Sequence, residues 1–406
     1  MRTTLACAAI ALAGVAVAAQ YPKFLTESPG VWKPWKGLTA IASARKEQAA
    51  TPALVKAFEA ELLALNAILQ RAPSVSPPTG FSVETWGSLD NYRQVEHAPG
   101  QPPPGRLPLM GAYTFGAFPI FEYERNGTVI REDTGETALQ DFAINQITRP
   151  LGERGGPREW GQVDHDAFLR PLPRGEFAGL PRYGDALVIA RDPAALWAPL
   201  TLRAALDIVV LARQAAVEAA RERVDAVTRE LAAARDPERR AQRQRDAEAG
   251  AVHFPDPKAF LAQMAEVWRK EEASLAADLE PSGGAATALA EATAALAEAT
   301  SWISALSPAE QAAPSCFAEG AGTLRTRFRA APAPGCHPLV RPNYAYFDPS
   351  LPRSAPQVVL ITGFTRCFDT ADPDNRGANA PGPHGCRANR ALVETMDKDA
   401  IRAWLR

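Results

Sequence analysis

Apolar side chains recur at helical spacing early in the chain and then at strand spacing. Steps of three and four residues predict a helix over 52–69, with Thr51 as its N-cap and Pro52 in its first turn. Apolar and polar side chains then alternate over 81–86, which predicts a strand with one buried face. The chain therefore begins as a mixture of α and β structure.

The same mixture continues to about residue 190. Aromatic and apolar side chains predict strands over 113–123 and 186–190. Asn126-Gly127 predicts a tight hairpin, because both residues tolerate the positive φ of a type I′ turn. We also expect a helix over 136–147, with Asp133 and Glu136 as a capping box at its start.

A seven-residue repeat marks residues 200–306. The apolar positions of one long helix are Val210, Val217, Val224 and Leu231, with Leu206, Ala220 and Val227 at the companion positions. Asp236-Pro237 predicts a break, and further helices are predicted over 258–279 and around 288–303. Short connections favour antiparallel neighbours, so we predict an antiparallel helical hairpin or three-helix bundle.

A continuous apolar run over 358–361 predicts a strand that is covered on both faces. A closing helix is predicted over 388–405. We expect the strand to pair with strands of the first half, which would make the helical region an insertion in one body.

The first residues have the pattern of a cleavable export signal. Arg2 precedes an apolar run over 5–19, which is shorter than the roughly 20 residues that span a bilayer as a helix. Small side chains at Val17-Ala18-Ala19 fit a signal peptidase site, so we expect the mature protein to begin at Ala19 or Gln20. We predict a periplasmic or secreted protein with no transmembrane segment in the mature chain.

Four cysteines remain after the predicted cleavage, and an even number in an exported protein favours disulfides. They allow three connectivities. Loops of about twenty residues favour Cys316–Cys336 and Cys367–Cys386. A zinc site with His337 or His384 is the alternative, but the close ligand pairs of zinc sites are absent, so we expect no metal or other cofactor.

The predicted fold class is α+β: a mixed α/β body with an inserted antiparallel helical hairpin or three-helix bundle and a disulfide-stapled C-terminal segment. The expected parts are a signal peptide over 1–19, a first part of the body over 20–199, the helical insertion over 200–306, and a C-terminal part over 307–406 that packs on the first part.

The sequence offers a few weak candidates for catalysis. Asp133-Thr134-Gly135 has the form of an aspartic-peptidase signature, although the capping box explains the same residues better. His165 and Asp166, which follow Asp164, form a compact acid–base or metal-binding cluster that we interpret as a polar loop. Ser43 and Lys46 match a Ser-x-x-Lys pattern without its partner motifs.

Two charged segments complete the candidates. Acidic residues over 369–375 resemble a calcium loop in composition but not in spacing. Five arginines are interleaved with acidic residues at the expected tip of the bundle: Arg235, Arg239, Arg240, Arg243 and Arg245. We interpret them as a solvated turn, with a contact site for an acidic partner as the alternative.

Two functional hypotheses follow. A net charge of −2 gives no reason to expect nucleic acid as a partner. The first hypothesis is a binding or assembly factor of the bacterial cell envelope that contacts a protein partner through the helical bundle. The alternative is a secreted hydrolase with a site assembled from scattered Asp and His residues of the body. The sequence alone leaves open whether the protein is an enzyme.

Overall fold

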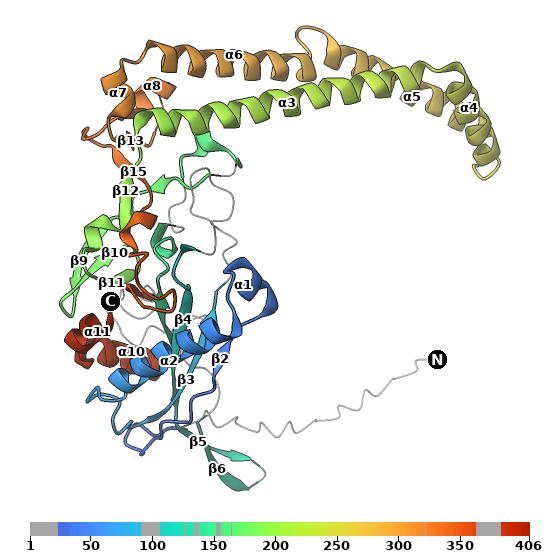
Figure 1. Cartoon of the computed structure of the whole chain (residues 1–406). Helices are drawn as coiled ribbons and strands as arrows, with labels where there is room; N and C mark the ends of the chain where they lie inside the picture. Colours follow the sequence, from blue (N-terminus) through green and yellow to red (C-terminus); the bar gives the residue numbers. More distant parts are fainter. Residues whose placement is uncertain are drawn as a thin grey trace, which may run out of the picture.

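The computed structural model consists of an α+β body and a long helical arm that projects from it (Figure 1). The structure describes residues 23–90, 106–125, 127–133, 138–151, 156–163, 165–320, 322–362 and 383–406. The arm lies between two segments that both belong to the body. The predicted α+β class with an inserted antiparallel helical hairpin is therefore confirmed.

An eight-stranded sheet forms the centre of the body. Its neighbouring strands are antiparallel except for β2 and β3, which are parallel. In spatial order the strands are β2 (Leu38–Thr39), β3 (Phe81–Leu89), β4 (Gly111–Pro119), β7 (Ala138–Ile144), β16 (Val358–Thr362), β11 (Ala186–Ala190), β10 (Leu180–Tyr183) and β9 (Pro173–Phe177).

Strand β16 comes from the C-terminal part of the chain and lies in this sheet between two strands of the first part. It pairs with β7 on one side and β11 on the other, as expected for a strand that unites both halves. Val359 and Ile361 point into one core cluster, whereas Val358 and Leu360 point into a second cluster on the opposite face. All four are fully buried, which explains the continuous apolar run.

One face of the sheet is covered by helices α2 (Pro52–Leu69), α10 (Pro383–Thr395) and α11 (Lys398–Trp404). Phe58, Leu62 and Leu65 of α2 pack against the sheet, and the hydroxyl of Thr51 accepts a hydrogen bond from the Leu54 N–H (3.3 Å). The predicted helix and its cap are thus present.

The expected hairpin at Asn126-Gly127 is formed by β5 (Phe121–Arg125) and β6 (Thr128–Glu132), and β1 (Lys23–Phe24) extends it to three strands. Asn126 lies outside the described residues, and Gly127 has a φ of 75°.

The helix predicted over 136–147 is wrong, because residues 138–144 form the central strand β7. Their side chains alternate between the two faces: Phe142 and Ile144 lie in one core cluster and Ala143 in the other. Asp133 therefore caps no helix.

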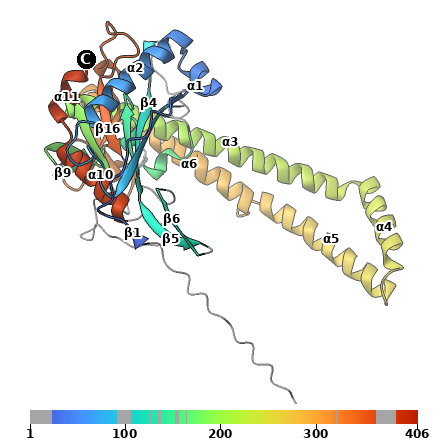
Figure 2. The same ribbon diagram turned by 90° about the horizontal axis from the view of Figure 1, so that it is seen from below.

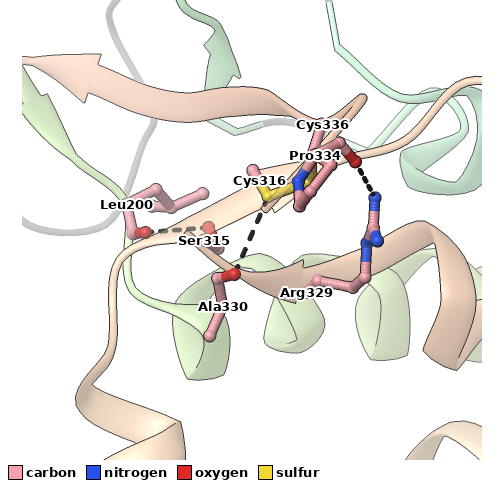
Figure 3. Close-up of a disulfide and its surroundings, with 7 residues drawn as sticks. All are labelled: Leu200, Ser315, Cys316, Arg329, Ala330, Pro334 and Cys336. Atoms are coloured by element: carbon pink, nitrogen blue, oxygen red, sulfur yellow. Dashed lines mark hydrogen bonds between the residues drawn. A yellow bond between two sulfur atoms is a disulfide. The ribbon is translucent and has the colours of Figure 1, made fainter. Parts of the chain in front are cut away.

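A small second sheet lies where the arm leaves the body. Its strands are β12 (Trp197–Pro199), β15 (His337–Pro342), β13 (Ser315–Phe317) and β14 (Phe328–Ala330), with β8 (Phe168–Leu169) paired to β15. The predicted Cys316–Cys336 disulfide is present and connects β13 to the residue before β15 (Figure 3). Ser315 donates from its hydroxyl to the Leu200 carbonyl (2.8 Å), which ties this sheet to the start of the arm.

Four helices form the arm: α3 (Leu202–Arg235), α4 (Pro237–Ala251), α5 (Pro257–Leu279) and α6 (Gly284–Ala305). Thr201, Asp236 and Asp256 cap three of them, each accepting from a backbone N–H in the first turn. The break expected at Asp236-Pro237 thus begins a separate helix, α4, which lies at the far end of the arm (Figure 2). Among the described residues, no helix is both long and apolar enough to cross a bilayer.

Candidate interaction surface

The arm is anchored to the body by a packed root. Leu202, Leu206 and Val209 of α3 belong to a buried cluster with Trp160 and Trp302. Trp160 also donates from its indole N–H to the Ala205 carbonyl (3.1 Å). Because these contacts are buried, the first turns of α3 have a fixed direction relative to the body.

Beyond the root, α3 runs antiparallel to α6 and then to α5. Contacts between the helices show this arrangement: Arg213 of α3 and Ala295 of α6 line one hollow, and Arg235 of α3 pairs with Glu272 of α5 (3.0 Å). The predicted apolar positions line the inner side of α3. Val217, Ala220, Val227 and Leu231 are buried, and Val210 and Val224 are half-buried.

The outer part of the arm is less well covered than the root. None of the 23 residues of α5 is buried, although Phe260, Met264 and Trp268 form a half-buried apolar row. In the turn before α5, Val252 is 71% exposed and Phe254 is 48% exposed. The apolar side chains of the tip are therefore accessible to another molecule.

The arginines of the tip are held largely by acidic residues of α5. Glu272 accepts from Arg235 and Arg240 (3.0 and 2.5 Å), and Glu271 accepts from Arg243 (3.3 Å). Hydrogen bonding to Arg235, supported by the charge of Arg240, lowers the pKa of Glu272. The tip is thus a network of ion pairs between helices, rather than only the solvated turn that the sequence predicts.

The last turn of α3, α4 and α5 line an open hollow of about 480 Å³. Its charged lining residues are Arg240, Arg243, Arg269 and Glu272, and its largest apolar lining residue is Trp268. Trp268, Glu271 and Glu272 are not among the candidates that the sequence indicates. The only signal for them was the α5 helical pattern, which does not show how α4 folds back onto α5.

Asp133, a candidate from the sequence, lies in an ion-pair network beside β3. Lys33 pairs with both Asp133 and Glu84 (3.0 Å each), and Lys36 also pairs with Glu84. Burial opposes ionisation of Glu84, but hydrogen bonds from Lys36 and Lys33 outweigh it and lower its pKa. For Asp133, burial is likewise outweighed by the Ser82 hydroxyl and by Lys33, so its pKa is also lowered.

His165 lies elsewhere, against the root of the arm. Its ring packs edge-on against Trp160 with centroids 4.8 Å apart, and its Nδ1 accepts from the Ala167 N–H (3.3 Å). Asp133 follows the end of β6, and His165 contacts Trp160, whose indole is bonded to the start of α3. The end of β6 and the start of α3 are at opposite ends of the body (Figure 1). Asp133 and His165 are therefore not brought together, and Asp166, beside His165, stays a prediction.

The remaining candidates from the sequence are not brought together into a site in the described part of the chain. Ser43 and Lys46 lie on the six-residue helix α1 (Ala42–Glu47), with Lys46 exposed. Asp164, Cys367 and the acidic segment over 369–375 lie outside the described residues. Cys386 is disulfide-bonded, whereas its expected pairing with Cys367 stays a prediction.

A half-buried carboxyl group, Asp90, follows β3 and is not among the candidates that the sequence indicates. Burial raises the pKa of Asp90, and Gln146 donates a hydrogen bond to its carboxylate. Arg149 and Asp141, which pair with each other (3.0 Å), exert opposite electrostatic effects on it. Within the ranges that the structure describes, no group of three His, Cys, Asp or Glu side chains forms a metal site.

Comparisons with known proteins give no relative: no protein-family model, curated protein or solved structure matches this chain. The function is therefore inferred from the residues and the structure of this chain.

Proposed function

We propose that this protein is exported and acts as a binding or assembly factor of the bacterial cell envelope, with the helical arm as its contact surface. The observation that carries the proposal is the arm itself. Helix α3 has 34 residues, so at 1.5 Å per residue it extends for about 51 Å. A projection of this length adds little to the core of the body, but it presents two long helical faces to a partner.

The arm's packing supports this role. Two layers of helices can cover only one side of each helix, so the outer faces of α3 and α5 remain open. Two exposed apolar side chains, Val252 and Phe254, lie close together in sequence in the turn between α4 and α5, and a third, Val267, lies further along α5. Exposed apolar residues that cluster, instead of occurring singly, are typical of protein-binding surfaces.

Export is supported by the apolar run over 5–19 and by the Cys316–Cys336 disulfide. Cleavage after Ala18 or Ala19 would leave β1, which begins at Lys23, intact. N-terminal sequencing of the protein from a periplasmic or culture fraction should return Ala19 or Gln20 as the first residue. An intact Met1 would contradict export by a cleaved signal.

An arm-truncated variant tests the binding function. Replacing residues 218–290 with a short Gly-Ser linker keeps the packed root, because Arg213 and Ala295 line one hollow at the root. The body should keep its melting transition, whereas partners captured by the full-length protein from envelope extract should be lost. Retention of the same partners by the truncated protein would overturn the proposal.

The hydrolase hypothesis has no comparable support in the described residues, because Asp133 and His165 lie in different parts of the body.

A further inference from the structure

The hollow at the tip of the arm has the size of a binding site rather than of a packing defect. Its volume of about 480 Å³ lies within the range of typical ligand pockets. Ala234 and Ala241, from α3 and α4, leave the space open because their side chains are small. Trp268 of α5 provides an aromatic wall, and its indole N–H makes none of the hydrogen bonds found among the described residues.

The charges around the hollow are unequal. Three of its four charged side chains are arginines, and the fourth, Glu272, is also held by Arg235 from α3. The charge of Glu272 is therefore compensated even if Arg240 turns towards a ligand. In the described part of the chain, Arg243 pairs with Glu271 and Arg269 pairs with Glu266, both on the exposed surface of α5. Exposed pairs of this kind are weak, so both guanidinium groups can exchange partners.

We propose that this hollow binds an acidic peptide segment that carries one apolar side chain. The apolar side chain packs against Trp268, and flanking carboxylates pair with Arg243 and Arg269. Tryptophan and arginine are, with tyrosine, the residue types enriched at the energetic centres of protein interfaces. The inference rests on the proposed binding function and adds the chemistry of the partner.

Fluorescence anisotropy with the full-length mature protein tests this inference. The probe is a short labelled peptide of glutamate and alanine with one central leucine. Two control peptides replace the leucine with serine or every glutamate with lysine. We expect saturable binding of the probe. The serine peptide should bind about tenfold more weakly, because a leucine side chain is no longer buried. The lysine peptide should not bind. Affinity for the probe should fall as salt is raised.

Variants locate the site. Arg269→Glu should weaken binding of the probe by about tenfold, since a repulsive charge replaces an attractive one, and Arg269→Lys should restore most of it. The side chain of Arg269 is 76% exposed, so the helices should remain folded, which circular dichroism can verify. Arg245→Glu is the matched control: it makes the same charge change on exposed α4, outside the hollow, and should alter affinity by less than about twofold.

Absence of saturable probe binding, or equal losses for Arg269→Glu and Arg245→Glu, would overturn the inference. This failure is distinguishable from failure of the proposed function. If the arm-truncated protein loses its envelope partners although the probe does not bind, only the peptide site is wrong. If the truncated protein keeps its partners, the binding function of the arm is wrong.

Discussion

Asn145 shows how a single buried polar residue connects three segments of the body. Its side-chain NH₂ donates to the carbonyls of Leu109 and Ala355 (3.0 and 3.1 Å), and its Oδ1 accepts from the N–H groups of Gln357 and Val358 (2.8 and 3.2 Å). The residue also has a positive φ of 59°, which asparagine tolerates better than most residues. Its side chain thus fixes the start of β16 beside the end of β7.

Replacement of Asn145 should be strongly destabilising. Asn145→Ala leaves four buried backbone groups without this partner, and we expect a loss of about 3 kcal/mol or more in the free energy of unfolding. Asn145→Gly removes the same hydrogen bonds but tolerates the positive φ, so its loss should be about 1 kcal/mol smaller. Urea denaturation measures both. A glycine variant less stable than the alanine variant would contradict this account of Asn145.

The ion pairs of Glu84 should make stability depend on pH. Since the folded-state pKa of Glu84 is lowered, its contribution is present above its unfolded-state pKa of about 4.3 and is lost as the pH falls through the folded-state value. The stability difference between the native protein and Glu84→Gln should therefore be largest near neutral pH and shrink in acid. A difference that stays constant, or that grows as the pH falls, would contradict the assignment.

For single residues, the sequence predicts a bonding partner only where the two residues are close together in the chain. Thr51 caps the helix that starts at Pro52, and its bonding partner, Leu54, is only three residues later, so spacing alone predicts this contact. Asp133 was assigned to a local capping box, but its partner is Lys33, one hundred residues earlier. No local pattern encodes that contact, because β3 and β6 bring the two residues together only in the folded chain.

Among the elements, the arm helices were predictable because their apolar period is long and regular. Strand β7 was not, because Ala138–Ile144 carries both apolar and polar side chains on each face, and Leu139 is 48% exposed although the strand lies near the centre of the sheet. Gln140, for example, is 1% exposed and lies between β4 and β16. A strand in the centre of a sheet therefore lost the alternation that a half-buried strand shows.

The inner side of α3 can be tested with a matched pair of charges. Val217 is 3% exposed, so Val217→Asp places a carboxylate between helices and should cost several kcal/mol. Ala219→Asp puts the same charge on the exposed face of α3 and should cost less than about 1 kcal/mol. Thermal and chemical unfolding report both variants. Similar losses for the two would mean that the seven-residue repeat does not define the packed side of α3.

The disulfide at the root of the arm should stabilise the small sheet. It closes a loop with a sequence separation of 20 residues, for which restriction of the unfolded chain predicts about 3 kcal/mol. The double variant Cys316→Ser with Cys336→Ser should lose a comparable free energy of unfolding under oxidising conditions. An unchanged denaturation midpoint would contradict a stabilising role for this bridge.

For the whole molecule, the sequence predicted the inserted helical hairpin but not the geometry of its tip. The insertion is predicted because the seven-residue repeat lies between two segments whose strands are expected to pair in one sheet. The hollow beside Trp268 depends on how α4 turns at Pro237 and meets α5, where contacts such as Arg243–Glu271 form. Such contacts join residues that are far apart in sequence, so no spacing rule indicates them.

Site-specific photo-crosslinking in the producing cell tests the central claim, that the arm is the contact surface. A photoreactive phenylalanine analogue replaces Phe254 at the tip of the arm or, as a control, Val129 on the β5–β6 hairpin; these side chains are 48% and 64% exposed. The account predicts a discrete crosslinked envelope partner from position 254 and none from position 129. A partner crosslinked from position 129 alone, or no crosslink from position 254, would contradict it.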